Sequence, residues 1–379
     1  MNPRVQEITG SLIREIAAKK TPGCMDLGLG EPSLKPTMSF WANAIRETEK
    51  DGLRYTLNAG DAALREAIGA HYLYPGLTSA ENVCVMTGSQ EAVYVVIKTL
   101  LDPAKDELLL IEPAFPAYAK MAKLEGAAVH SVSMDPADGF AFDPERILAA
   151  VGEKTRLIVI CSPCNPTARV ITREAVHTMS EGLLARGGDP IYVLHDEIYL
   201  EQTFVDDAGH FAAIYPHTIV TNSLSKSNAL TGLRLGWSIA PKEIAAAIVK
   251  THAWVTSCAS TFSQRVAMEI FNTPGALHEH AGWYRDQRLA VNDALAQSGL
   301  RYVPVEGSFY ACVKLPEGTE SIEAAHELAD HHGVIAIPGI AFGESLEGWL
   351  RLSWVSPIDD VREGIKRIAN YCQKDHSLR

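Results

Sequence analysis

The chain has 379 residues, a length that accommodates two or three domains and a large hydrophobic core. Hydrophobic residues make up 47% of the chain and charged residues 21%, proportions that are ordinary for a water-soluble globular protein. The formal net charge of −12 argues against nucleic acid as the main partner, because binding to phosphate backbones requires a basic surface.

The N-terminal segment and the cysteines indicate where the protein works. Residues 1–20 lack the apolar core of a signal peptide, and no run of about 18 apolar residues occurs, so we expect neither a signal peptide nor a membrane span. Seven cysteines without disulfide-framework spacing predict reduced thiols in the cytoplasm. The histidine clusters lack partners at metal-ligand spacing, so no metal site is expected.

The chain opens with two expected helices separated by a glycine-rich turn. Residues 4–20 space their apolar side chains like one face of a helix, and residues 37–50 are expected to form a second helix. Between them, residues 25–32 predict a short strand that runs into the turn. Gly30 lies there, where the lack of a side chain lets the backbone approach a ligand closely; a plain turn explains these residues equally well.

Two further turns follow, one after an aromatic residue and one after a strand. Tyr55 precedes a glycine-containing loop, and on these residues alone we expect it to pack against its neighbours. Residues 82–87 predict a strand that leads through Gly88, Ser89 and Gln90 into an apolar helix. Free N–H groups and the helix dipole make such a turn an anion site, although simple capping of the helix by Ser89 is the alternative.

Two more predicted strands end in proline-rich turns. Phe115 lies between two prolines after the strand at residues 107–111, and core packing is its simpler role. Asn165 follows the strand at residues 157–161 and is held by the adjacent Pro166, since proline restricts the residue before it.

A carboxylate follows the next predicted strand, at residues 191–194. Asp196 comes just after it, with Tyr199 three residues further on. Asp196 is either a simple cap or the partner of a protonated ring nitrogen in a bound aromatic group. These residues alone leave both alternatives open.

A lysine with hydroxyl neighbours follows the strand at residues 218–221. Lys226 is preceded by Ser223 and Ser225 and followed eight residues later by Arg234. A neutral lysine forms a Schiff base with an aldehyde, and serines with an arginine bind a phosphate. For a lone serine-lysine motif a surface lysine is the better explanation, but the complete spacing favours a site that holds an aldehyde and a phosphate together.

The C-terminal third carries an arginine in an apolar strand. Residues 302–314 and 333–337 predict strands of a smaller unit, and Arg351 lies within the apolar segment 349–353. A buried arginine is costly unless an anion pairs with it. A ligand carboxylate would supply that anion.

The order of these elements predicts the fold class. Strands alternate with helices, which is typical of an α/β protein with a mostly parallel central sheet between helices. Ligands of such sheets bind beyond the carboxyl ends of the strands, where the polar turns lie. We expect a large domain at residues 41–277 and a smaller α+β domain built from residues 1–40 and 278–379.

From about residue 25 to residue 355, these motifs and their order resemble the class I and II aminotransferases, enzymes of fold type I that use pyridoxal 5′-phosphate (PLP). The resemblance implies transfer of an amino group from an L-amino acid to a 2-oxo acid through a lysine aldimine. It also implies a homodimer with shared active sites. The chain departs from the family at Ala168, which stands where the motif N-P-T-G has its glycine.

The resemblance also assigns roles to the candidate residues. Lys226 would hold PLP and move the substrate proton, Asp196 would pair with the pyridine nitrogen, and Tyr199 would bond the phenolic oxygen. Phosphate contacts are expected from Gly88, Ser89, Gln90, Ser223, Ser225, Arg234 and, from the neighbouring subunit, Tyr55. Ring stacking is expected from Phe115, and substrate contacts are expected from Gly30, Asn165 and Arg351, with Asn165 also bonding the phenolic oxygen.

Two alternatives and the substrate stay open. Other PLP chemistry, such as a β-lyase, γ-replacement, oxidase or cyclase reaction, would use the same cofactor residues. A regulator with an aminotransferase-like body would need an added DNA-binding domain, for which we expect no room before residue 25. Gln90 is neutral, which argues against strict aspartate specificity, and Leu29, Phe309 and Tyr310 favour apolar or aromatic side chains.

Overall fold

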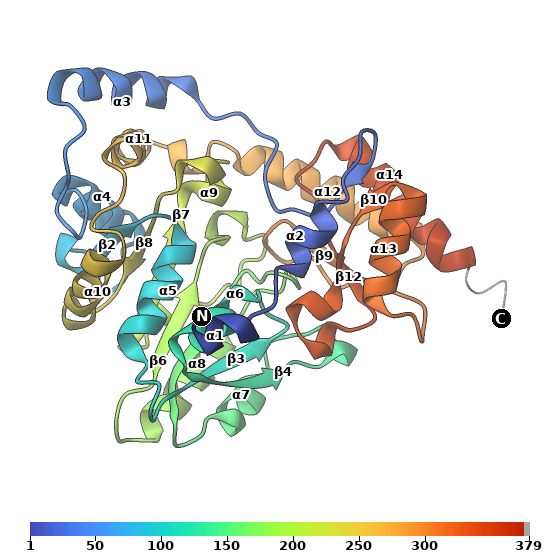
Figure 1. The fold of residues 1–379 in the computed structure, drawn as a ribbon, viewed down its shortest axis with the longest axis horizontal. Coiled ribbons are helices and arrows are strands. Elements are labelled where there is room, and N and C mark those ends of the chain that lie inside the picture. Colours follow the sequence, from blue (N-terminus) through green and yellow to red (C-terminus); the bar gives the residue numbers. More distant parts are fainter. Residues whose placement is uncertain (375–379) are drawn as a thin grey trace.

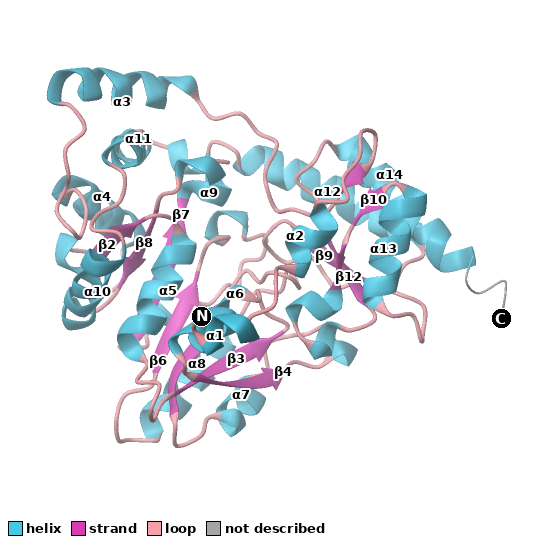
Figure 2. Cartoon of the chain, in the orientation of Figure 1, coloured by secondary structure: helices cyan, strands magenta, loops and turns pink. Residues whose placement is uncertain are grey.

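A sheet of seven strands lies at the centre of the molecule, and the computed structural model describes residues 1–374 (Figure 1, Figure 2). Its strands are β2 (Val83–Met86), β3 (Glu107–Glu112), β4 (Ala128–Ser133), β5 (Thr155–Cys161), β6 (Tyr192–Asp196), β7 (Thr218–Ser223) and β8 (Gly236–Ile239). They lie in the order β2-β8-β7-β6-β5-β3-β4. All neighbouring pairs are parallel except those that β8 makes with β2 and β7, so the predicted fold class is confirmed.

Helices that precede, connect and follow these strands complete this part of the molecule. They are α3 (Met38–Asp51), α4 (Ala62–Tyr72), α5 (Ser89–Leu100), α6 (Ala117–Glu125), α7 (Pro144–Ala150), α8 (Arg173–Ala185), α9 (Leu224–Ser227), α10 (Lys242–Val255) and α11 (Thr261–Asn272). Among them, α5 packs on β7 and β8, and α6 packs on β3 and β4. The residues of β7 are all buried, as expected for a strand with both faces covered.

A smaller unit combines elements from both ends of the chain. Its elements are α1 (Pro3–Glu7), α2 (Leu12–Ala17), β1 (Met25–Asp26), α12 (Ala281–Ser298), β9 (Tyr310–Lys314), α13 (Ser321–His332), β10 (Val334–Ile335), β11 (Ile337–Pro338), β12 (Trp349–Ser353) and α14 (Ile358–Lys374). β11, β12 and β9 form an antiparallel sheet, and β1 pairs in parallel with β10.

The pairing of β1 with β10 ties the start of the chain to its C-terminal third. This supports the division expected from the sequence, which we retain as a proposal: a large domain at residues 41–277 and a small one at residues 1–40 and 278–379. Residues 375–379 lie outside the described part of the chain.

The first predicted helix was wrong in its extent. Residues 4–20 form two short helices instead of one, because the chain is extended at Ile8 and the side chain of Ser11 accepts a hydrogen bond from the backbone N–H of Arg14, which starts α2. The predicted strand at residues 302–314 is also shorter, since regular pairing in β9 begins only at Tyr310.

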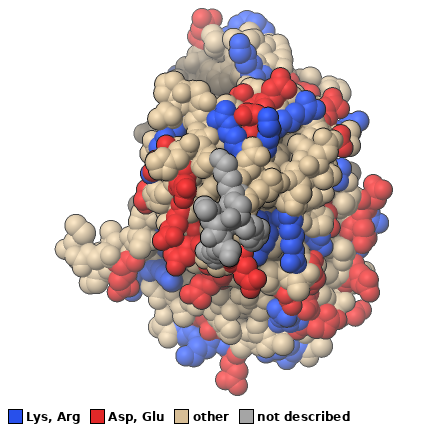
Figure 3. All heavy atoms as spheres, turned by 90° about the vertical axis from the view of Figure 1, so that its right-hand side faces the viewer, with Lys and Arg blue, Asp and Glu red and all other residues tan. Residues whose placement is uncertain are grey.

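The surface agrees with the charge balance of the sequence. On the face drawn in Figure 3, basic and acidic side chains are interspersed, and no continuous basic patch is visible there. Within residues 1–374, no helix is both long and apolar enough to cross a membrane.

Candidate active site

A cleft of about 770 Å³ lies where the central strands end and the smaller unit meets them. Segments that are far apart in the sequence line it, from the turn after β1 to strand β12. The predicted residues that line it are Gly30, Ser89, Gln90, Phe115, Asn165, Asp196, Tyr199, Ser225, Lys226, Arg234 and Arg351. The structure therefore brings most of the predicted site together.

Lys226 lies at the floor of this cleft, in the short helix α9. Ser223 caps the helix, its hydroxyl accepting a hydrogen bond from the backbone N–H of Ser225 at 3.1 Å. The Lys226 Nζ donates to the carbonyl oxygen of Gly30 at 2.6 Å and lies 5.6 Å from the centre of the Phe309 ring. Burial, followed by the charge of Arg351, lowers the pKa of Lys226 to about 8.

This lowered pKa predicts how the amine reacts. We expect capture of a simple aldehyde at Lys226 to accelerate as pH rises, with a midpoint near 8, because only the neutral amine is a nucleophile. The measurement is borohydride trapping of the adduct across a pH series, followed by mass spectrometry of the peptide that carries Lys226. A midpoint at the ordinary lysine value of 10.5 would contradict the environment described here.

An anion cradle lies beside the lysine, at the N-terminus of α5. Gly88 has φ +91°, and a Cβ there would lie 2.6 Å from Arg234 Nη2. A Cβ on Gly236 would lie 2.4 Å from the backbone nitrogen of Ser89. Both glycines are therefore needed for Arg234 and the first turn of α5 to converge.

The cradle is open to an anionic ligand. The guanidinium of Arg234 donates to the carbonyl oxygen of Thr231 at 2.8 Å, and no ion pair joins it to a carboxylate within residues 1–374. An arginine and free N–H groups at a helix N-terminus are the standard donors to a phosphate.

Asp196 is a fully buried carboxylate at the end of β6. Its Oδ1 accepts a hydrogen bond from the Thr221 hydroxyl at 3.0 Å, and its Oδ2 accepts one from the Tyr118 hydroxyl at 2.6 Å. Burial raises the pKa of Asp196, and these hydroxyl donors act against that rise. No lysine or arginine pairs with Asp196 in the described chain, so a ligand cation would find an unpaired carboxylate here.

Arg351 is buried in β12 and held flat between two aromatic rings. Its guanidinium carbon lies 4.3 Å from the centre of the Tyr310 ring and 4.8 Å from that of Phe342. Its Nη1 donates to Asn165 Oδ1 at 3.1 Å, and its Nη2 donates to the carbonyl oxygen of Gly28. The Nε has no hydrogen-bond partner, and no carboxylate pairs with Arg351 in the described chain, which fits an arginine that receives a ligand carboxylate.

Three of the predicted contacts do not reach the cleft of their own chain. Tyr55 is 89% exposed and lies in a separate surface depression beside Cys258 and Phe262. Gly88 and Ser223 lie directly behind the lining residues, where Gly88 makes room for Arg234 and Ser223 caps α9.

One predicted pocket residue was wrong, and several lining residues were missed. Phe309 is completely buried and does not line the cleft, whereas Leu29 and Tyr310 do. Phe309 lies in the turn before β9, whereas Tyr310 is the first residue of that strand and lines the cleft. Among the missed lining residues are Ser11, Ile13, Arg14, Glu31, Val93, Tyr118, Lys120, Met121 and Leu124. Of these, only Tyr118 carried a sequence signal, its spacing of three from Phe115.

Comparison with known proteins assigns this fold and site to a class. The sequence profile of the family "Aminotransferase class I and II" matches residues 22–368. The chain therefore belongs to the class I and II aminotransferases: it is an aminotransferase of fold type I, in a family whose enzymes depend on PLP.

Individual relatives cover nearly the whole chain. It is 32% identical over 377 residues to the aspartate aminotransferase of Pyrococcus horikoshii, covering 96% of this chain and 95% of that protein. The aspartate aminotransferase of Thermus thermophilus, solved with maleate, superposes with a TM-score of 0.89 at 27% identity over 98% of this chain and 99% of that one. An aromatic aminotransferase from P. horikoshii superposes with a TM-score of 0.87 at 26% identity over 97% and 100%.

The described residues fit the cofactor of this family. A lysine amine with a lowered pKa suits an aldehyde, and the cradle of Ser89 and Arg234 suits a phosphate. The unpaired carboxylate of Asp196 suits a protonated pyridine nitrogen. The aldehyde, the phosphate and the ring nitrogen of PLP therefore each have a counterpart in the cleft.

Proposed function

We propose that the cleft binds PLP through Lys226 and transfers amino groups from L-amino acids with apolar or aromatic side chains to 2-oxo acids. The observation that supports this most strongly is the position of the Lys226 amine. It lies in one cleft with two arginines that have no carboxylate partner in the described chain, Arg234 and Arg351. Arg234 suits the phosphate of the cofactor, and Arg351 suits the α-carboxylate of a substrate.

The chemistry is divided between the cofactor and the chain. PLP, when bound, supplies an electron sink for a carbanion at the substrate Cα. Lys226 is proposed to act first as the nucleophile for the aldehyde, and then, once released, as the base whose Nζ takes the proton from Cα. The carbonyl of Gly30, now bonded to Nζ at 2.6 Å, would hold the released amine near its working position.

The other residues orient the reacting groups. Arg351 and the backbone at Gly30 are proposed to fix the substrate carboxylate, which decides which bond at Cα stands perpendicular to the cofactor ring. Asn165 and Tyr199 are proposed to bond the phenolic oxygen of the cofactor, Asp196 to pair with its ring nitrogen, and Phe115 to cover its ring. Ser89, Gln90, Ser225 and Arg234 are proposed to hold its phosphate, with Gly88 and Ser223 supporting them.

The substrate class follows from the rest of the cleft lining. The apolar side chains of Ile13, Leu29, Val93, Met121 and Leu124 outnumber the charged ones to which no role is assigned, those of Arg14, Glu31 and Lys120, and Gln90 is neutral. The names of the relatives, aspartate and aromatic aminotransferases, do not agree on one substrate. The proposal is tested by measuring the kcat/KM of amino-group transfer for a panel of amino acids, with phenylalanine, leucine, norleucine and aspartate as its core. Cysteine and serine, which carry a leaving group on Cβ, are added to the panel, and release of ammonia and pyruvate from either of them without a new amino acid would favour the lyase alternative.

We also propose that the protein works as a homodimer in the cytoplasm. Tyr55 is highly exposed, as are Leu53, Leu57 and Trp254, an unusual set of large side chains to leave in water. A second subunit that covers them would bring Tyr55 to the neighbouring phosphate cradle. Cys84, Cys161, Cys164 and Cys312 are buried free thiols, which supports a reducing compartment.

Shared sites predict complementation between two inactive variants. Mixing the Lys226→Ala and Tyr55→Ala proteins under exchanging conditions is expected to restore about a quarter of the active sites, because a mixed dimer regains one intact site. Activity of the mixture is compared with that of each variant alone. No gain after demonstrated subunit exchange would contradict the shared site.

A further inference from the structure

Tyr118 contacts two of the groups that are expected to touch the cofactor ring. It lies in the first turn of α6, three residues after Phe115, so both side chains lie on the same side of the chain. The rings of Phe115 and Tyr118 meet edge to face, with their centres 5.8 Å apart and an angle of 84°. The hydroxyl of Tyr118 donates to Asp196 Oδ2 at 2.6 Å.

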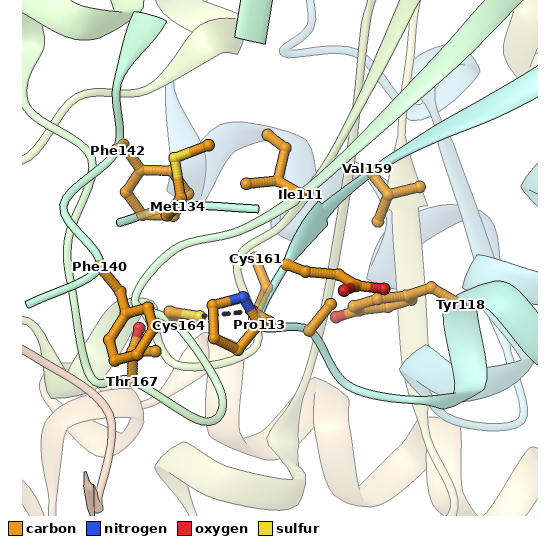
Figure 4. A pocket seen from close by; sticks show the side chains of 12 residues that line it. Ile111, Pro113, Tyr118, Met134, Phe140, Phe142, Val159, Cys161, Cys164 and Thr167 are labelled. Atoms are coloured by element: carbon orange, nitrogen blue, oxygen red, sulfur yellow. Dashed lines mark hydrogen bonds between the residues drawn. The ribbon is translucent and has the colours of Figure 1, made fainter. Parts of the chain in front are cut away.

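The groups that favour the charged form of Asp196 are the hydroxyls of Tyr118 and Thr221, the His195 ring and the backbone N–H of Ile198. Tyr118 is 3% exposed, and the cavity on its far side has a volume of about 20 Å³. Figure 4 shows Tyr118 and Cys161 together at the edge of this cavity. Because a water molecule needs about 10–15 Å³, the cavity has room for about one water.

We propose that Tyr118 is a positioning residue for the cofactor. Its hydroxyl keeps Asp196 ionised and directed at the pyridine nitrogen of PLP, and its aromatic ring holds Phe115 against the face of the pyridine ring. The inference rests on the proposed binding of PLP in this cleft. Tyr118 would then act through Asp196 and Phe115, without touching the reacting atoms.

The physical reason is the cost of a buried carboxylate. An ionised Asp196 needs donors on both oxygens, and Tyr118 and Thr221 supply one each. Removing the Tyr118 hydroxyl withdraws the donor from Oδ2 and favours the protonated carboxyl, which pairs poorly with a cationic ring nitrogen. Hydrogen bonds to charged groups are worth roughly tenfold to hundredfold in an equilibrium constant.

The test measures PLP binding to the cofactor-free protein, with Tyr118→Phe as the variant. We expect its dissociation constant for PLP to rise roughly tenfold to hundredfold. Tyr215→Phe is the matched control, since Tyr215 is equally buried and donates at the same 2.6 Å, but to the carbonyl of Ile191 away from the cleft. An unchanged dissociation constant for Tyr118→Phe would overturn the proposal.

A second experiment distinguishes a positioning role of Tyr118 from a merely structural one. In an Asp196→Asn background, Tyr118→Phe is expected to change PLP affinity by less than about twofold, because the interaction that it removes is already lost. A full additional loss there would show that Tyr118 acts independently of Asp196 and would also overturn the proposal. If the unmodified protein fails to bind PLP, the proposed function falls and this inference falls with it.

The pH dependence gives a third, independent readout. PLP binding is expected to weaken on acidification in two steps, first as Lys226 becomes protonated and at lower pH as Asp196 becomes protonated, and Tyr118→Phe should move only the second midpoint to higher pH. The other titratable groups beside Asp196 are His195 on the same strand and Cys161 on β5, and they are common to both proteins. A shift to lower pH, or no shift, would contradict the role of the hydroxyl.

Discussion

Replacing Lys226 with alanine is expected to abolish transamination, lowering kcat by about 10³-fold or more, because the same amine serves as nucleophile and as base. The variant should also lose the visible absorbance of lysine-bound PLP. Both changes follow from the position of Nζ at the cleft floor, where it bonds to the carbonyl of Gly30 and has a pKa lowered to about 8. The measurements are steady-state turnover and the absorbance spectrum of the purified variant.

A matched control shows that the effect belongs to this lysine. Lys314 also lies over an aromatic ring, with its Nζ 5.3 Å from the centre of Trp349, but it does not line the cleft. Lys314→Ala should therefore keep both the absorbance and the turnover. A small primary amine added to Lys226→Ala should restore part of the proton transfer. Undiminished transamination by Lys226→Ala would remove this residue from the mechanism.

The second large effect is expected at Arg351. Replacing it with alanine should raise the KM for amino acids and lower kcat/KM by roughly 100-fold or more, since a fork of two charged hydrogen bonds to the α-carboxylate is lost. Arg351→Lys should be intermediate, because the charge remains while the planar fork and its stacking between Tyr310 and Phe342 are lost. The measurement is a KM and kcat determination for each variant.

The control for Arg351 is an arginine on strand β5 of the central sheet. Arg156 stacks on Tyr192 at 5.6 Å and donates to the carbonyl of Pro190, but it lies outside the cleft. Arg156→Ala should leave the KM for amino acids within about twofold of the original. An unchanged KM in Arg351→Ala would assign the α-carboxylate to another group.

Five strands of the central sheet and the main site residues could be predicted because each of these strands is an apolar run that ends in a polar turn. Strands β4 and β8 were not predicted: β4 is half polar and largely exposed, and β8 is only four residues long and begins at a glycine. Parallel strands gather these turns at one edge, so the order of elements alone predicts that Asn165, Asp196 and Lys226 converge. That convergence depends on the backbone arrangement and not on the details of side-chain packing.

The predictions from the sequence failed where side-chain packing or local capping determines the structure. The helix expected at residues 4–20 is interrupted because local capping by Ser11 competes with a continuous helix. Phe309 and Tyr310 are adjacent, and only the packing of the turn that leads into β9 decides which of them faces the cleft. Tyr118 meets Asp196 across 78 positions in the sequence, a contact that no local spacing reveals.

The measurement that tests the central proposal most directly is the near-ultraviolet and visible absorbance of the purified protein, first with PLP alone and then with an amino acid. We expect an absorbance band of lysine-bound PLP that converts to that of the aminated cofactor when phenylalanine or leucine is added. Addition of a 2-oxo acid should restore the first band. The absence of any such band after PLP is added would contradict the assignment of this cleft as a PLP site.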